Sequence, residues 1–336
     1  MSTDVLSDVL RAVRLTGAVY FSIDASAPFA AETLPAREVA PHVLPGAEHV
    51  IEYHLITHGT CWGGIVGEEP VRLEEGDVIA FPQGDPHVLS SSPGMRGRPS
   101  LDEYRRPVGS QLPFLMRDGG GGEHTQIVCA FVGCDARPFN PLLATLPRTL
   151  RVSARDAGGW LGAVAQLAVA ESSGPRSGGE SVLARASELI FVEIIRRHVA
   201  ALPAEQTGWL AGLRDPFVGR ALAALHDRPA EQWTVESLAK VSALSRSALA
   251  ERFVQIVGEA PMQYLTRWRM QLAATSLRSR NVSVFAAAVE VGYASEAAFS
   301  RAFKKVVGVP PAAWRDGQRG HEATPSVPAR RATGRT

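Results

Sequence analysis

The segment Ser245-Arg-Ser-Ala-Leu-Ala-Glu-Arg-Phe253 recurs further along the chain as Ser295-Glu-Ala-Ala-Phe-Ser-Arg-Ala-Phe303. At the same spacing after each copy come a glycine and a proline: Gly258 and Pro261, then Gly308 and Pro311. The leading serine is a strong helix N-cap, because its hydroxyl accepts a hydrogen bond from a free amide of the first turn. The glycine suits a helix end that needs a positive φ. A duplicated helix-turn-helix explains this pattern better than an enzyme motif does.

Each copy predicts a first helix, a turn and a second helix. Thr234 and Ser283 are the expected caps of the first helices, and Gly292 lies in the turn of the second copy. A helix of about Pro261–Arg278 joins the copies. The residues expected to form the two small cores are Leu238, Leu249 and Phe253, then Ala288, Phe299 and Phe303.

The exposed faces of the two second helices carry short polar and basic side chains, as a helix that reads the DNA major groove requires. Arginine can donate two hydrogen bonds to guanine, and glutamate can accept one from the cytosine amino group. Lysines and the free amides of a capped helix suit phosphates. The predicted DNA contacts are Arg246, Ser247, Ala250 and Glu251 in copy one, Glu296, Ala297, Ser300 and Arg301 in copy two, and Lys304, Lys305 and Thr234 for the backbone. The alternative is that these are ordinary solvated faces.

Charge is distributed unevenly along the chain of 336 residues, although its net charge is only +1. Residues 1–214 hold 18 Lys/Arg and 24 Asp/Glu, whereas residues 215–316 hold 13 and 9. The part with the repeat is therefore the basic part, as phosphate contact requires. Three cysteines are too few for a disulfide framework, and no apolar run or leader pattern indicates a membrane span or secretion. We expect a cytoplasmic protein.

The remaining chain predicts an α+β protein. Residues 1–155 read as an antiparallel β-barrel or sandwich, with residues 93–123 as a long loop. The expected strands are Ala18–Ile23, Val50–Thr57, Gly63–Val66, Val78–Phe81 and Gln126–Val132. Residues 156–202 form a helical flank, with helices at Leu161–Val169 and Val182–Leu202 that either cover the barrel or form a dimer interface. Residues 203–214 read as a linker, residues 215–316 as the helical DNA-binding domain, and residues 317–336 as a disordered tail.

Residues 215–316 resemble the AraC/XylS-type DNA-binding domain. The matching runs are Trp233-Thr-Val-Glu-Ser-Leu-Ala239, Ser245–Phe253, Pro261-Met-Gln-Tyr-Leu-Thr-Arg-Trp-Arg-Met270, Val291-Gly-Tyr-Ala-Ser295 and Phe299-Ser-Arg-Ala-Phe-Lys-Lys305 with Gly308-Val-Pro-Pro311. The resemblance implies two helix-turn-helix modules on a rigid helix, with recognition helices in successive major-groove segments about 34 Å apart. One departure is Glu251, which stands where the family commonly has a basic residue.

The N-terminal part resembles a cupin barrel in the run Gly76-Asp-Val-Ile-Ala-Phe-Pro-Gln-Gly-Asp-Pro-His87. The resemblance implies that His87 points into the barrel mouth. The preceding strand lacks the usual His-x-His pair, and Ser91 replaces the usual Asn. The candidate effector-binding residues are Tyr53, His54, Trp62 and His87. The candidate ligands for a transition metal such as zinc are His54, His87 and Cys129. The alternative is that Cys129 and His87 are packing residues.

Together these patterns predict a ligand-responsive, sequence-specific DNA-binding transcription regulator with no catalytic residues. Its expected partners are double-stranded DNA, a small-molecule effector, a second copy in a homodimer and RNA polymerase, with no membrane contact. One alternative is a metal-dependent cupin oxygenase fused to a DNA-binding domain. Another is DNA alkyl-damage repair, which requires an activated cysteine thiolate. No cysteine here stands in the setting typical of that chemistry.

Overall fold

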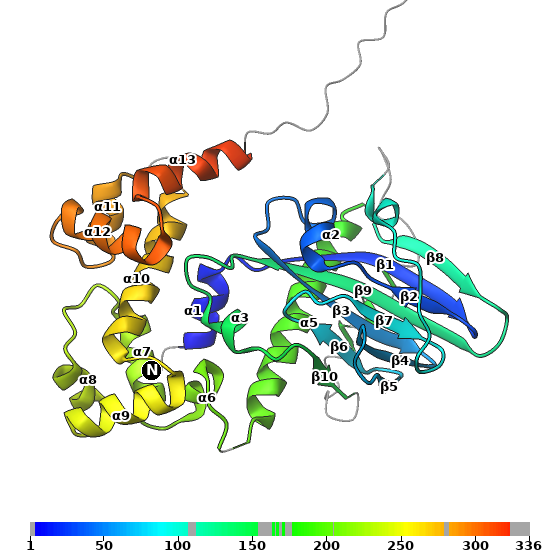
Figure 1. The fold of residues 1–336 in the computed structure, drawn as a ribbon, viewed down its shortest axis with the longest axis horizontal. Helices are drawn as coiled ribbons and strands as arrows, with labels where there is room; N and C mark the ends of the chain where they lie inside the picture. The colour runs from blue at the N-terminus through cyan, green and yellow to red at the C-terminus, as the bar shows by residue number, and fades with distance from the viewer. Residues whose placement is uncertain are drawn as a thin grey trace, which may run out of the picture.

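The computed structural model describes residues 4–106, 112–153, 163–164, 166–167, 170–171, 177–203, 205–278 and 282–322. A sheet-rich N-terminal region is followed by a helical C-terminal region (Figure 1). The strands are β1 Thr16–Ser26, β2 Ala30–Glu32, β3 His49–His58, β4 Thr60–Ile65, β5 Val71–Glu74, β6 Val78–Phe81, β7 His87–Ser90, β8 Phe114–Gly119, β9 His124–Cys134 and β10 Leu150–Val152. The helices around them are α1 Val5–Ala12, α2 Ala36–Val43, the 3₁₀ turn η1 Leu101–Tyr104, α3 Pro141–Thr145 and α5 Gly179–Ala201.

Two sheets face each other. One has the order β10-β6-β3-β9-β1-β8 and the other the order β2-β7-β4-β5. Successive side chains of a strand point to opposite faces, and β3 follows this rule strictly. Val50 and Ile56 pack between the two sheets, whereas Ile51, Tyr53 and Leu55 pack in a separate core on the outer face. The two central strands, β3 and β9, are therefore buried on both faces.

Helix α5 covers the outer face of the six-stranded sheet and makes its main contacts with β1, β9 and β10. Leu183, Ile190, Phe191 and Ile194 are buried there, so this helix covers the core of its own chain, one of the two roles expected for it. The expected helix Leu161–Val169 lies largely outside the described residues.

All five expected strands are present, and the described residues contain five further strands. The reading of residues 93–123 as one long loop was wrong, because β8 lies within it and pairs in parallel with β1, Phe21 opposite Phe114. Only three of the six residues in β8 have apolar side chains, so the segment carries no clear strand signal. Parallel pairing at a sheet edge depends on the distant strand β1, which local sequence cannot reveal.

The C-terminal region contains α6 Trp209–Arg214, α7 Val218–Asp227, α8 Val235–Val241, α9 Arg246–Val257, α10 Pro261–Leu277, α11 Val284–Glu290, α12 Glu296–Val307 and α13 Pro311–Glu322. The expected caps are all made: Thr234, Ser245, Ser283 and Ser295 each accept a hydrogen bond from the amide three residues on. Gly258 and Gly308 both have a φ of 90°. We call residues 234–258 module one and residues 283–308 module two.

Two expectations for the flanking segments need correction. Residues 209–214 of the expected linker form α6, whose Trp209 is buried and donates a hydrogen bond of 2.8 Å from its indole to the Tyr264 hydroxyl. A large aromatic side chain therefore anchors this segment to the helical region. The expected disordered tail starts as helix, because α13 continues through Glu322; residues 323–336 lie outside the described part of the chain.

The two modules are packed differently. The core of module one, with Leu249, Phe253 and the α10 residue Trp268, is continuous with the core between α5 and the six-stranded sheet. Module two has a separate core that includes Phe299 and Phe303. Helix α10 spans both (Figure 1). Module one is thus joined to the N-terminal region by shared hydrophobic packing. Among the described residues, no helix is long and apolar enough to span a membrane.

We expect Phe303→Ala to destabilise module two by about 3–5 kcal/mol, the usual cost of removing a buried phenyl ring. Because its core is separate, faster hydrogen exchange should be confined to residues 283–316 and to residues 270–277 of α10, which pack in the same core. The matched variant Phe253→Ala should also speed exchange in α6 and α7. Hydrogen exchange read by mass spectrometry measures both, and equal acceleration in β3 and β9 for Phe303→Ala would contradict the separation of the cores.

Candidate functional site

The outer faces of α9 and α12 present the predicted DNA contacts to solvent. Arg246, Ser247 and Glu251 are exposed on α9, and Ala250 is half-buried. The predicted contacts on α12 behave in the same way: Glu296, Ala297, Arg301, Lys304 and Lys305 are exposed, and Ser300 is half-buried. Thr234 is also exposed, at the start of α8.

The cationic side chains on these faces are not neutralised by any acidic group in the described part of the chain. Among the described residues, Arg246, Arg301, Lys304 and Lys305 make no ion pair, whereas neighbouring Arg252 binds the Asp215 carboxylate with two nitrogens. Asp215 also accepts hydrogen bonds from the amides of Phe217 and Val218 at the start of α7. The basic groups of the recognition faces thus remain available to an anionic partner. Arg252, by contrast, stabilises the packing of α9 against the start of α7 through its pair with Asp215.

A second candidate site lies between the two sheets. Glu52 and His54 are two residues apart on β3, so strand alternation points both inward. Cys129 lies opposite His54 in the β3–β9 register, and His87 begins β7 in the other sheet. All four are almost completely buried.

The imidazoles of His54 and His87 face each other through their Nε2 atoms, which are 2.6 Å apart. The other nitrogen of His87, Nδ1, lies 2.9 Å from the Asp85 carbonyl oxygen and so carries a hydrogen. Nδ1 of His54 lies 2.9 Å from the Cys129 sulfur. These contacts assign the tautomers: the Cys129 thiol donates to His54, His54 donates through Nε2 to His87, and His87 donates to Asp85.

Burial keeps this cluster neutral. It raises the pKa of the Glu52 carboxyl to about 8 and lowers the pKa of His87 to about 4. It also lowers the pKa of His54 well below its usual range, with His87 contributing, and raises the pKa of the Cys129 thiol. The Glu52 oxygens lie 3.7 Å from His54 Nε2 and 3.8 Å from His87 Nε2. Since neither imidazole is charged near neutral pH, these contacts are not ion pairs.

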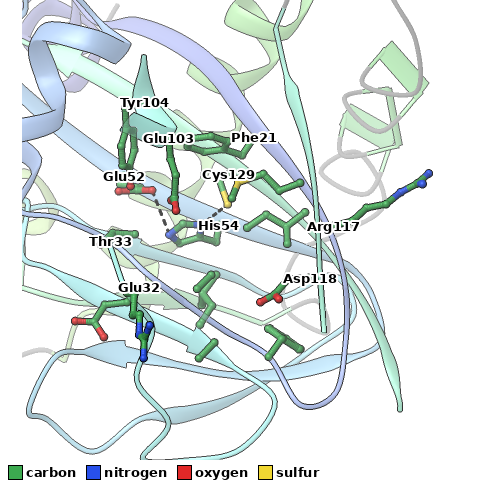
Figure 2. A pocket seen from close by; sticks show the side chains of 17 residues that line it. Phe21, Glu32, Thr33, Glu52, His54, Glu103, Tyr104, Arg117, Asp118 and Cys129 are labelled. Atoms are coloured by element: carbon green, nitrogen blue, oxygen red, sulfur yellow. Dashed lines mark hydrogen bonds and ion pairs between the residues drawn. The ribbon is translucent and has the colours of Figure 1, made fainter. Parts of the chain in front are cut away.

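A cavity of about 330 Å³ opens beside Glu52, His54 and Cys129. Figure 2 shows these three side chains with Phe21 and Tyr104 around the same space. Apolar side chains form much of the wall: Phe21, Ile23, Phe29, Leu89, Tyr104 and Met116. Charged residues line it too, among them Arg98, Glu103 and Arg117. A cavity in which polar groups converge beside an apolar wall is typical of small-molecule sites.

The structure brings together only part of the predicted pocket. His54 lines the cavity. His87 does not line it, but its Nε2 atom contacts the His54 ring. Tyr53 does not line it: it lies on the outer face of β3, where its hydroxyl donates to the Ser187 carbonyl oxygen of α5 at 3.0 Å. Trp62 is also absent from the wall, because its neighbours Cys61 and Gly63 take the inward positions of β4.

The predicted metal ligands also need one correction. Cys129 approaches Nδ1 of His54, whereas His87 approaches Nε2 on the other side of the same ring. A single ion at the Nε2 atoms is therefore out of reach of the sulfur. Glu52, which was not predicted, faces both Nε2 atoms instead. Its position two residues before His54 on a β-strand was the signal that could have identified it.

Comparisons with known proteins agree with both halves of this architecture. A cupin family profile matches residues 4–200, and a helix-turn-helix domain profile matches residues 238–317. An AraC-like transcription regulator of Streptomyces lividans is 35% identical over 276 residues, which cover 80% of this chain and 88% of the relative. The HTH-type transcriptional regulator AlkR of Acinetobacter baylyi is 29% identical over 271 residues, with coverages of 80% and 88%. A solved structure, the DNA-binding domain of AdpA in complex with a target DNA, is 31% identical, covers 33% of this chain and 99% of that chain, and has a TM-score of 0.31.

Proposed function

The chain belongs to the AraC-like transcription regulators with an N-terminal cupin domain, and on that premise we propose that α9 and α12 read two segments of an operator while the buried pocket binds a small-molecule effector. That the protein is a DNA-binding regulator follows from the family. The contacts and the effector site are our proposal. The observation that carries it is the pair of capped helices α9 and α12, whose exposed basic side chains make no ion pair with any residue that the structure describes.

Arg301 is the proposed base contact of module two, and Lys304 and Lys305 are proposed to bind phosphates. Arginine reaches guanine with two parallel hydrogen bonds, and Arg301 is exposed at the middle of the outer face of α12. In module one the acidic Glu251 occupies the corresponding position, one helical turn beyond Ser247, where a cytosine amino group is the matching donor. The two half-sites should therefore differ in sequence.

The proposed effector site is the cavity beside Glu52 and His54. Its volume of about 330 Å³ favours a compact molecule, and the Glu52 carboxyl group, which makes no hydrogen bond among the described residues, is proposed to bind a polar group of that molecule. A homodimer and a contact with RNA polymerase also belong to this proposal. Supporting a second copy, Val182 and Leu189 remain exposed on α5 although the opposite face of that helix is buried.

A route from the pocket to the DNA-binding helices runs along β9. This strand carries Cys129 at the pocket and ends next to Asp135, a buried carboxylate. Asp135 accepts two hydrogen bonds from Arg14, at 2.9 and 3.0 Å, and lies 3.2 Å from the Arg278 guanidinium. Arg278 caps the end of α10 and also pairs with Glu48 at 3.1 Å.

Helix α10 is held at a second point by Gln271, which is buried. Its side chain accepts from the Phe139 amide and donates to the Ala12 carbonyl oxygen, both at 3.0 Å. Hydrogen bonds and ion pairs thus hold α10, the helix that carries both modules, against the N-terminal region. We infer that an effector shifts the equilibrium between two arrangements of these contacts between α10 and the N-terminal region. A ligand that binds one of two conformations better can alter binding at a distant site in this way.

Arg301→Ala tests the reading of module two. The probe is a duplex selected by the wild-type protein from a randomised library, with binding followed by fluorescence anisotropy over a range of salt concentrations. Loss of a bidentate guanine contact should weaken binding by about 1–3 kcal/mol. Arg37→Ala removes the same charge from an exposed position of α2 and should have little effect. Unchanged affinity and unchanged salt dependence for Arg301→Ala would rule out the proposed contact.

Asp135→Asn tests whether the ion pair between Asp135 and Arg278 holds the end of α10 against the N-terminal region. Removing the charge from a buried carboxylate that serves two arginines should cost about 3 kcal/mol, which corresponds to roughly a hundredfold faster local exchange. We expect this acceleration in the amides of residues 270–278, measured by hydrogen exchange. Asp102→Asn, which breaks an exposed pair with Arg105, is the control. If exchange in α10 stayed at the wild-type rate, Asp135 would not hold the helix.

A further inference from the structure

The wall of the cavity between the two sheets is rich in carboxyl groups. Of the described residues that line it, four are acidic and two are basic: Glu32, Glu52, Glu103 and Asp118, against Arg98 and Arg117. Glu32 is already neutralised, because Arg96 donates two hydrogen bonds to its carboxylate, at 2.5 and 2.7 Å, and the Gly97 amide donates a third at 3.0 Å. Glu103 and Asp118, by contrast, make no ion pair within the described part of the chain.

The two arginines of the wall do not compensate this acidity. The Arg117 side chain is 85% exposed, and its nearest carboxylate is that of Asp24, at 3.9 Å and outside the wall. Figure 2 shows Arg117 directed away from the cavity, whereas its neighbour Asp118 points inward. Arg98 is exposed as well. The space inside therefore has an excess of carboxyl groups, which attracts a cationic molecule and repels an anionic one.

Glu52 adds a buried carboxyl group that is free to bind a ligand. It lines the cavity, is only 2% exposed and makes no hydrogen bond among the described residues. A buried polar group without a hydrogen bond destabilises a protein, so such a group usually has a partner. Because a carboxyl group keeps an acceptor oxygen with or without its proton, Glu52 can accept from an N–H donor in either state. Figure 2 shows the Glu103 carboxyl group directed into the same space.

Aromatic rings supply the second feature that suits a cation. Phe21, Phe29 and Tyr104 line the cavity. The rings of Phe21 and Tyr104 meet almost at a right angle, with an interplanar angle of 80° and centroids 5.4 Å apart. The face of an aromatic ring is electron-rich and attracts an ammonium group that lies within about 6 Å of the ring centroid. The same rings can pack against the apolar body of a ligand.

We propose that the effector is a compact organic cation, with a primary ammonium group on an aromatic or aliphatic body. This gives the chemical class of the molecule and rests on the proposed effector site. The ammonium group donates hydrogen bonds to Glu52 and Glu103, and the body packs against Phe21, Phe29 and Met116. An ammonium group has three donors and no acceptor, which matches a wall whose free polar groups are carboxyl oxygens. A carboxylate on the effector would instead be repelled by Glu103.

Three probes of nearly the same shape separate charge from shape. Phenethylamine is a cation near neutral pH, phenethyl alcohol is neutral, and phenylacetate is an anion. Binding of each to the full-length protein is measured by isothermal titration calorimetry. We expect the amine to bind about tenfold more tightly than the alcohol, because a charge-assisted hydrogen bond and a ring contact are added to the shared apolar contacts. Phenylacetate should bind more weakly than the alcohol.

Two variants identify the carboxyl groups involved. Glu103 is exposed, so Glu103→Gln removes its charge with little risk to the fold. Glu52→Met removes the buried acceptor at similar volume. Each should weaken binding of the amine by about tenfold, and Glu103→Gln should leave binding of the alcohol unchanged. Glu38→Gln, which removes an exposed carboxylate from α2 outside the wall, is the matched control and should bind all three probes as the wild type does.

The proposal is overturned if the alcohol or phenylacetate binds as tightly as the amine, or if either wall variant binds the amine as tightly as the wild type. Tight binding of the alcohol or phenylacetate leaves the effector site in place and removes only the cationic class. Absence of binding by all three probes overturns both the cationic class and this pocket as the effector site. Operator binding of the same samples is followed in parallel, so the DNA-binding function is judged separately.

Discussion

Strands β3 and β9 are buried on both faces, and this constraint governs how the rest of the molecule is arranged. A strand whose two faces are both apolar needs a covering layer on each side. Helix α5 provides one layer and the four-stranded sheet provides the other. The same alternation that sends Tyr53 toward α5 sends Glu52 and His54 into the space between the sheets. The location of the pocket is therefore a consequence of strand periodicity.

The outer layer also explains why the modules differ. The core under α5 extends without interruption through α6 and α7 into module one, whereas module two packs around its own phenylalanines. Trp268 of α10 belongs to the first core and Met270 to the second. Gln271 comes directly after Met270, and its buried side-chain amide is hydrogen-bonded to the N-terminal region. A shift of that region thus acts on α10 at the junction between the two modules.

Local chemistry in the sequence predicted the helical half almost completely. Caps such as Ser245 and the positive φ of Gly258 depend on neighbours within a few residues, so they can be recognised without the fold. The N-terminal half depends on distant contacts. The face that Tyr53 occupies and the existence of β8 are decided by α5 and β1. Trp209 looked like part of a linker because its partner Tyr264 is far away in the sequence. His54 and Cys129 were both predicted as site residues. That Cys129 approaches the Nδ1 side of the His54 ring, and not the Nε2 side that faces His87, follows from the register of β3 and β9, which the sequence does not show.

The buried polar cluster links the two sheets, so a change within the cluster can change the distance between the sheets. His54 belongs to the six-stranded sheet and His87 to the four-stranded one, so whatever lies between their Nε2 atoms sets a distance between the layers. A proton holds the rings at 2.6 Å, and any larger occupant separates them. His54 pairs with Cys129 of β9, and β9 leads directly to Asp135 and its two arginines. Because close-packed cores transmit strain, we infer that a change of a fraction of an ångström at the histidines is passed along β9 to Asp135 and to the end of α10.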